Sequence, residues 1–80
     1  MRIDKYLKNA RLIKRRTIAK EACEQERVSL NGKTAKPGSE VKAGDVIEVR
    51  FGQSLIRLEV LSTPEHVTKE DALGMYRMLS

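Results

Sequence analysis

The chain has 80 residues, a net charge of +5 and a hydrophobic content of 40%. This length suits one small domain and leaves little room for the deep cleft of a typical enzyme. The single cysteine excludes an internal disulfide, and no apolar run reaches the roughly 18 residues of a membrane helix. The first residues are charged and lack the apolar stretch of a secretory signal. We therefore expect a single domain over residues 1–80 that works in the cytoplasm.

The first two predicted elements are helices. Apolar residues spaced three and four apart predict a short helix over residues 3–9. A basic connection follows, and a second helix is predicted over about residues 15–25. The side chains that this helix is expected to bury are Ile18, Ala19, Ala22 and Cys23.

The middle of the chain predicts an antiparallel sheet. The dipeptide Asn31-Gly32 indicates a tight hairpin turn, because both residues tolerate positive φ. Alternation of apolar and polar residues indicates two longer strands further along the chain. The four predicted strands cover about residues 28–30, 33–35, 46–51 and 55–61.

A final helix is predicted over about residues 69–79. Thr68 and Asp71 have the spacing of a capping box, with Asp in place of the usual Glu. The side chains expected on its buried face are Ala72, Met75, Tyr76 and Leu79. The expected order is ααββββα, an α+β fold in which two N-terminal helices pack on a small antiparallel sheet and a C-terminal helix follows.

Basic residues are concentrated at the start of the chain. Residues 1–20 hold eight basic residues and one acid, a charge of +7, whereas residues 21–80 hold eight basic residues and ten acids, a charge of −2. Such asymmetry indicates a polyanionic partner. The candidate contacts in the basic segment are Arg2, Lys5, Lys8, Arg11, Lys14, Arg15, Arg16 and Lys20. Lys33 and Lys36 flank the predicted hairpin and would widen this surface, although solvated turn lysines explain them equally well.

The charges of the second predicted helix stand in the unfavourable order. A helix carries partial positive charge at its start and partial negative charge at its end. Lys14, Arg15 and Arg16 nevertheless stand at its start, and glutamates stand at its end. Anion capture explains this order, because free backbone N–H groups and cationic side chains at a helix start together bind phosphate. On this interpretation Arg16→Glu should abolish binding and slightly stabilise the fold.

No catalytic or metal-binding constellation is visible in the sequence. His66, the only histidine, is expected in a surface loop, and Cys23, the only cysteine, is expected in the core. One cysteine and one distant histidine are too little for nucleophilic catalysis, and no metal-ligand spacing occurs. The sequence predicts a binding protein that is not an enzyme and that needs no cofactor and no metal.

Folded RNA is the polyanion that the residues favour. A membrane-surface helix would need bulky apolar residues that the sheet requires for its own core. Single-strand binding needs several exposed aromatic side chains, and the chain has only three aromatic residues. A helix that reads the DNA major groove would be repelled by the acidic end of the second helix. A phosphate contact at the start of that helix suits recognition of RNA by shape.

Four segments carry a resemblance to a known family. They are Arg2-Ile3-Asp4-Lys5-Tyr6-Leu7, Arg11-Leu12-Ile13-Lys14-Arg15-Arg16-Thr17, Val28-Ser29-Leu30-Asn31-Gly32 and Gly44-Asp45-Val46-Ile47-Glu48-Val49. In this order and spacing they resemble the RNA-binding domain first recognised in small-subunit ribosomal protein four, over about residues 1–50. Residues 51–80 would then add a hairpin and the C-terminal helix. The length, the Arg50-Phe51-Gly52-Gln53 turn and Met75-Tyr76 resemble the RqcP family, a standalone relative of the fifteen-kilodalton heat-shock protein.

The resemblance implies a function in bacterial ribosome-associated quality control. Proteins of the RqcP family bind a large ribosomal subunit that still carries peptidyl-tRNA after a stalled ribosome has split. They contact large-subunit rRNA and the tRNA, and their partner RqcH then extends the nascent chain with alanine. By this resemblance Arg2 and Arg16 would be the leading RNA contacts, and Asp4 would orient a neighbouring arginine. The chain would act as a monomer, away from membranes.

Two alternatives and one departure accompany this resemblance. The chain could instead be an RNA-binding protein that recycles ribosomes under heat stress, or a separately encoded RNA-targeting module of an RNA-modifying enzyme. Co-purification with RqcH and peptidyl-tRNA distinguishes the first alternative from the quality-control function. The departure is Glu26, just past the second helix, where the family usually has Gly. If the backbone there is left-handed, a glutamate costs about 1 kcal/mol.

Overall fold

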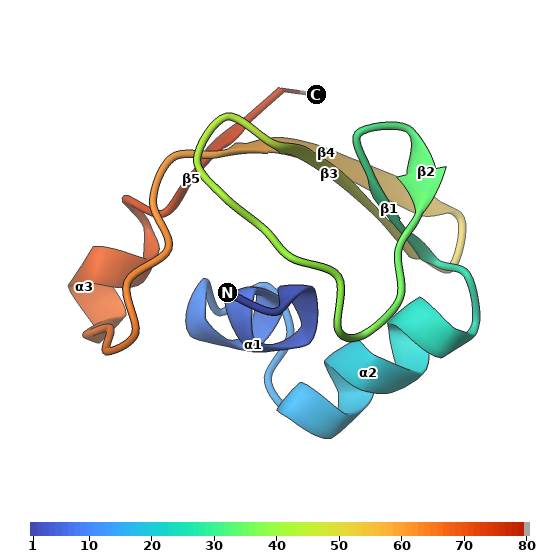
Figure 1. The fold of residues 1–80 in the computed structure, drawn as a ribbon, viewed down its shortest axis with the longest axis horizontal. Coiled ribbons are helices and arrows are strands. Elements are labelled where there is room, and N and C mark those ends of the chain that lie inside the picture. Colours follow the sequence, from blue (N-terminus) through green and yellow to red (C-terminus); the bar gives the residue numbers. More distant parts are fainter. Residues whose placement is uncertain (80) are drawn as a thin grey trace.

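The computed structural model describes residues 1–79, which form three helices and a five-stranded antiparallel sheet. The elements are α1 (Ile3–Asn9), α2 (Arg16–Glu24), β1 (Val28–Leu30), β2 (Lys33–Thr34), β3 (Val46–Phe51), β4 (Ser54–Val60), α3 (Lys69–Ala72) and β5 (Tyr76–Met78). The strand order is β2-β1-β3-β4-β5, and α1 and α2 lie on one side of the sheet (Figure 1). The predicted α+β class is confirmed. Within residues 1–79, no helix is both long enough and apolar enough to span a membrane.

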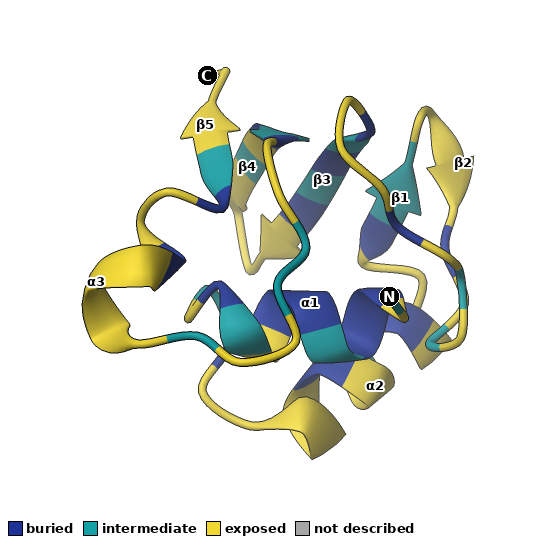
Figure 2. Ribbon diagram, turned by 60° about the vertical axis from the view of Figure 1, so that its left-hand side comes forward, coloured by how far each residue is buried: buried dark blue, intermediate teal, exposed yellow. Residues whose placement is uncertain are grey.

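The core lies between the helices and the inner face of the sheet. Buried residues line the surfaces of α1, β3 and β1 that face one another (Figure 2). The largest fully buried side chains are Tyr6, Ile3, Leu7, Ile47, Leu58, Met75, Val28, Val41, Val49 and Val60. Ile47 and Val49 alternate with more exposed neighbours along β3, as the sequence predicts.

The predicted buried face of α2 is too wide. Ala19 and Cys23 are buried, but Ala22 is only half-buried and Ile18 is 48% exposed. Residues four apart on a helix share a narrow stripe. Ala19 and Cys23, which are four residues apart, form this stripe and face the core. Ile18 lies outside the stripe, so the prediction that it is buried is wrong.

The hairpin turn between β1 and β2 is confirmed and is tied to β3. Asn31 and Gly32 both have positive φ, 52° and 83°. The Asn31 side chain accepts a hydrogen bond from the backbone N–H of Val46 at 2.8 Å and donates one to Asp45 at 3.2 Å. The turn residue therefore also fixes the entry to the next strand.

The predicted C-terminal helix ends early. Its capping contact is present, because Thr68 Oγ1 accepts a hydrogen bond from the Asp71 N–H at 3.2 Å. The helix is only Lys69–Ala72, and the chain then returns as β5, with Tyr76 opposite Val60 of β4. Glycine is a poor helix former, so the helix stops before Gly74. Pairing with the open edge of β4 then satisfies the backbone of the following residues. The prediction of a helix over residues 69–79 is therefore wrong beyond Ala72.

The side chains predicted for the buried face of that helix differ in their exposure. Ala72 and Met75 are buried, Tyr76 is half-buried and Leu79 is exposed.

The C-terminal segment packs on the first helix. The hydroxyl of Tyr6 donates a hydrogen bond to the carbonyl oxygen of Met75 at 2.7 Å. Burial of Tyr6 raises the pKa of this hydroxyl well above its usual value, so it stays protonated as a donor. Met75 is fully buried in the same core. Residues beyond the predicted RNA-binding motif thus help to hold α1 in place.

Both α1 and α2 end with a residue in left-handed conformation that is not glycine. Arg11 has φ 60° after α1, and Glu26 has φ 61° after α2. After α2, the N–H of Glu26 donates to Cys23 O at 3.0 Å and the N–H of Arg27 donates to Ala22 O at 2.9 Å. This pair of hydrogen bonds is a Schellman motif, whose left-handed position favours glycine. The left-handed geometry considered for Glu26 is therefore present.

Glu26→Gly is expected to stabilise the fold by about 1 kcal/mol, because glycine has no Cβ to clash in left-handed backbone. In a domain of this size this equals a rise in melting temperature of about 4–8 °C. Circular-dichroism melts measure the change. Gln25→Gly is the control, since Gln25 has an ordinary φ of −88° and glycine there should lower the melting temperature. A rise for both variants, or for neither, would contradict the explanation.

Candidate nucleic-acid interface

The basic segment forms α1, the turn after it and the start of α2. Arg2 precedes α1, Arg15 is the N-cap residue of α2, and Arg16 is its first residue. Of the eight basic side chains in residues 1–20, seven are exposed and Lys5 is half-buried. Contacts bring five of the eight into two groups, one around Asp4 and one around a pocket at the end of α1.

The first group is built on a buried carboxylate. The side chain of Asp4 is only 3% exposed. Arg2 donates to both of its oxygens, from Nε to Oδ1 at 3.2 Å and from Nη2 to Oδ2 at 3.1 Å. Nη2 of Arg16 lies 3.6 Å from Oδ1. The expectation that Asp4 orients a neighbouring arginine is confirmed, and Asp4 orients two of them.

The backbone around Arg2 is also fixed. Arg2 forms a β-bridge with Glu40, and the N–H of Ile3 donates to Ser39 O at 2.8 Å. The N–H of Lys5 donates to Oδ1 of Asp4 at 2.7 Å. Arg2 and Arg16 nevertheless remain 51% and 48% exposed. Each guanidinium has five N–H donors, so donors remain for an outside anion after the contacts to Asp4.

The start of α2 has the charge order that the sequence predicts. Its first turn contains no acid, its last turn contains no base, and the N-cap residue Arg15 makes no capping hydrogen bond with its side chain. Backbone N–H groups and cations therefore meet at this end of the helix. The ion pair with Asp4 corrects one expectation, because a glutamate at position 16 would face a buried carboxylate. Arg16→Glu is therefore not expected to stabilise the fold.

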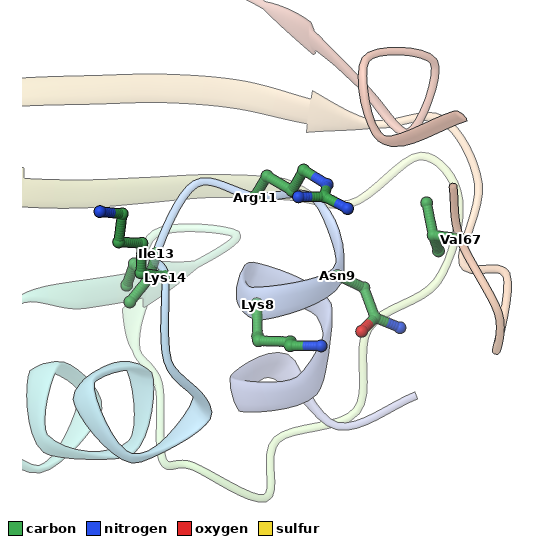
Figure 3. A pocket seen from close by; sticks show the side chains of 6 residues that line it. All are labelled: Lys8, Asn9, Arg11, Ile13, Lys14 and Val67. Carbon is green, nitrogen blue, oxygen red and sulfur yellow. The ribbon is translucent and has the colours of Figure 1, made fainter. Parts of the chain in front are cut away.

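The second group lines a pocket of about 160 Å³ at the end of α1 (Figure 3). Its lining residues are Lys8, Asn9, Arg11, Ile13, Lys14 and Val67. Lys8 and Asn9 come from α1, the next three residues come from the turn before α2, and Val67 comes from the loop before α3. Three of the predicted contact residues thus line one hollow, and of these Lys8 and Arg11 extend toward the side where Val67 lies, whereas Lys14 extends the other way (Figure 3).

The remaining candidates are not drawn into these groups. Nζ of Lys5 forms an ion pair with Glu65, which lowers the pKa of that exposed carboxyl. Lys36 lines a groove beside Glu24 and Glu26, at the acidic end of α2. Lys20 is exposed on α2 and Lys33 is exposed on β2. Arg15, the exposed N-cap residue of α2, also lies outside both groups. A role in RNA binding stays a prediction for all ten candidate residues.

Asn9 and Val67 are pocket residues that the sequence alone does not identify. Asn9 donates hydrogen bonds to the carbonyl oxygens of Pro64 and Glu65, at 3.4 and 3.5 Å. These contacts join segments that are about 55 residues apart, for which periodicity and local motifs give no signal.

Cys23 is held in the protonated state. Burial, with Asp4 and Glu24 nearby, raises the pKa of its thiol to about 11. At neutral pH the group is therefore a packed thiol and not a nucleophile. Within residues 1–79, no three side chains of the His, Cys, Asp and Glu types come together as a metal site.

Known proteins are similar to this chain in sequence. The S4 domain family matches residues 1–47. A protein named RQC P-site tRNA stabilizing factor from Halalkalibacterium halodurans is 53% identical over 78 residues, which cover 98% of this chain and 89% of that protein. Its namesake from Bacillus subtilis is 52% identical over 79 residues, which cover 99% of this chain and 92% of that protein.

A solved structure supports the same grouping. Heat shock protein 15 of Vibrio cholerae superposes with a TM-score of 0.92 at 30% identity, and the match covers 100% of this chain and 82% of that one. The resemblance inferred from the four sequence segments is confirmed. The chain belongs to the S4 domain family and groups within it with the proteins named RQC P-site tRNA stabilizing factor.

Proposed function

We propose that this chain is an RNA-binding factor of ribosome-associated quality control. Its target is a large ribosomal subunit that still carries peptidyl-tRNA, and it contacts both the rRNA and the tRNA. The observation that carries this proposal is the pair of exposed guanidinium groups held on one buried carboxylate. The names of its relatives, RQC P-site tRNA stabilizing factor, supply the biological setting.

The arrangement around Asp4 suits the recognition of phosphate. Arginine binds phosphate through two parallel N–H donors, and this geometry requires a fixed guanidinium plane. The bidentate contact of Arg2 with Asp4 fixes one such plane, and Arg16 lies against the same carboxylate. Because these side chains are ordered before binding, less conformational entropy is lost when RNA arrives.

The proposed role is positional and requires no catalysis by this chain. A tRNA on a lone large subunit has lost its small-subunit contacts and would drift from the productive position. A protein that contacts both RNAs restores that position, and misplacement by about 1 Å can slow a reaction about a hundredfold. RqcH, the proposed partner, could then use aminoacyl-tRNA repeatedly and extend the nascent chain with alanine.

The salt dependence of binding tests this function. If about five to seven phosphates are contacted, log affinity should fall with log salt concentration at a slope of roughly −4 to −6. The measurement is pelleting of the purified protein with large subunits that carry peptidyl-tRNA, with vacant subunits as the control. A slope shallower than about −2, or equal binding to vacant subunits, would contradict the proposal.

Heat-stress recycling of ribosomes is the second candidate. The structural likeness to heat shock protein 15 of Vibrio cholerae favours it. It predicts binding to free large subunits without any need for peptidyl-tRNA or RqcH. The comparison of loaded and vacant subunits separates the two functions.

A further inference from the structure

The pocket at the end of α1 is a hollow and not only a charged surface. It has a volume of about 160 Å³, and Ile13 and Val67 give it apolar walls (Figure 3). A buried cavity of about 150 Å³ is large enough to hold benzene. By volume, the pocket, which is open to solvent, has room for a single flat ring.

Within the described residues 1–79, the cations of this pocket have no ion-pair partner. Among residues 1–79, acidic side chains pair with Arg2, Lys5 and Arg16 within the basic segment, but none pairs with Lys8, Arg11 or Lys14. Lys8 and Arg11 extend toward the same side of the pocket (Figure 3), where their like charges repel one another and a bound anion would relieve that repulsion. A cation in the last turn of a helix interacts favourably with the partial negative charge there, which accounts in part for a lysine at position 8 in α1. This interaction does not explain Lys14, which lies in the turn beyond the helix.

Arg11 occupies the left-handed position after α1. Its N–H donates to Lys8 O at 3.0 Å and the N–H of Leu12 donates to Leu7 O at 3.1 Å, which is the Schellman pattern again. Glycine would be more stable at its φ of 60°. Strained backbone of this kind is concentrated at binding and active sites. The side chain of Arg11 extends toward the side of the pocket where Val67 lies (Figure 3).

The far wall of the pocket comes from outside the S4 match. Val67 lies beyond residues 1–47, in a loop that folds back on α1. Asn9 holds this loop through hydrogen bonds to Pro64 and Glu65, and Lys5 pairs with Glu65 beside them. The pocket is therefore complete only when the C-terminal segment is folded against the N-terminal domain.

We propose that this pocket holds one unstacked nucleotide of the RNA partner, an inference that rests on the proposed function. The base lies between the guanidinium of Arg11 and Val67, and the phosphate lies against the ammonium of Lys8, which extends toward the same side of the pocket (Figure 3). Proteins recognise unpaired RNA bases by stacking them on aromatic or guanidinium planes, while lysines bind the backbone. Apolar walls would be of no use to a surface that touches only the phosphates of paired RNA.

Three RNA hairpins of equal length test the inference with the full chain. One is fully paired, one carries a single bulged nucleotide, and one carries the same bulge without its base. Base stacking in single-stranded complexes corresponds to roughly 5- to 150-fold in affinity. We expect the bulged hairpin to bind at least about fivefold more tightly than the other two in fluorescence anisotropy.

Variants assign this preference to the pocket. Arg11→Gly should remove the preference for the bulge and at the same time raise the melting temperature, because it relieves the left-handed strain. Arg11→Lys, the matched control, keeps the charge and should bind the paired hairpin as the unchanged protein does, without preferring the bulge. Asn9→Ala should reduce the preference without any change of charge, because it frees the loop that carries Val67.

Equal affinity for the bulged and base-free hairpins would overturn the inference and leave the proposed function standing. The inference also fails if Arg11→Gly keeps the preference for the bulge. Binding to loaded large subunits with no binding to any hairpin would also reject the pocket and support the proposed function. Failure to bind loaded subunits would contradict the proposed function itself.

Discussion

Arg2→Ala and Arg16→Ala are each expected to weaken binding to large subunits that carry peptidyl-tRNA by about 10- to 100-fold. A hydrogen bond to a charged group contributes about 1.5–3 kcal/mol, and each 1.4 kcal/mol is a factor of ten. Each variant leaves Asp4 with the other arginine and with the Lys5 N–H as partners, so no buried charge is stranded. The fold should therefore persist while binding is lost.

Pelleting with purified loaded subunits measures this loss. Lys69→Ala is the control, because Lys69 is exposed on α3 and its removal lowers the net charge by the same single unit. It should bind nearly as well as the unchanged protein. If Arg16→Ala and Lys69→Ala weaken binding equally, Arg16 contributes only charge and makes no specific contact. Circular-dichroism melts of all three variants confirm that each is folded.

Asp4→Asn is expected to weaken binding to loaded subunits by about 3- to 10-fold, although it makes the protein more positive. Coulomb attraction alone predicts the opposite, since the net charge rises by one unit from +5. The loss arises because a neutral amide holds the guanidinium groups of Arg2 and Arg16 less firmly than a carboxylate does. The arginines then lose order before RNA arrives, and more entropy is lost on binding.

Glu24→Gln is the matched control for this prediction. It adds the same charge on the exposed part of α2, and it should leave binding unchanged or make it slightly tighter. A double-mutant cycle then separates positioning from simple loss of stability. Arg16→Ala should weaken binding less in the Asp4→Asn background than alone, and Lys14→Ala should show no such coupling. Tighter binding by Asp4→Asn would show that Asp4 merely opposes the RNA.

Local signals account for the parts of the fold that the sequence predicts well. The three-and-four spacing places α1 at residues 3–9, where the structure has it. The Asn31-Gly32 turn sets the register of the first hairpin, and alternation gives β3 over residues 46–51. Each of these patterns is decided by residues close together in the chain.

The end of the chain is decided by a distant partner. Ala72, Met75 and Tyr76 have helical spacing, so they predict a helix that continues to residue 79. The structure instead pairs Tyr76–Met78 with β4, and this depends on the open edge that β4 offers. No pattern inside the last twelve residues contains that information.

The candidate site also has one part that local sequence signals predict and another part that depends on distant contacts in the fold. The concentration of cations makes Arg2 and Arg16 two of eight candidates in residues 1–20, and the family resemblance singles them out as the leading ones. That both arginines lie against one carboxylate appears only once α1 and α2 are packed together. The pocket wall formed by Val67 requires the chain to fold back over α1, which composition and spacing do not encode.

The decisive experiment for the proposed function is mass spectrometry of the C-terminus of a non-stop reporter. The protein is deleted from its host, and the unchanged chain, Arg16→Ala or Lys69→Ala is restored in its place. We expect alanine tails with the unchanged chain and with Lys69→Ala, and none in the deletion or with Arg16→Ala, while stalled ribosomes still split. Normal alanine tails in the deletion or the Arg16→Ala strain would contradict the proposed function and favour heat-stress recycling of ribosomes.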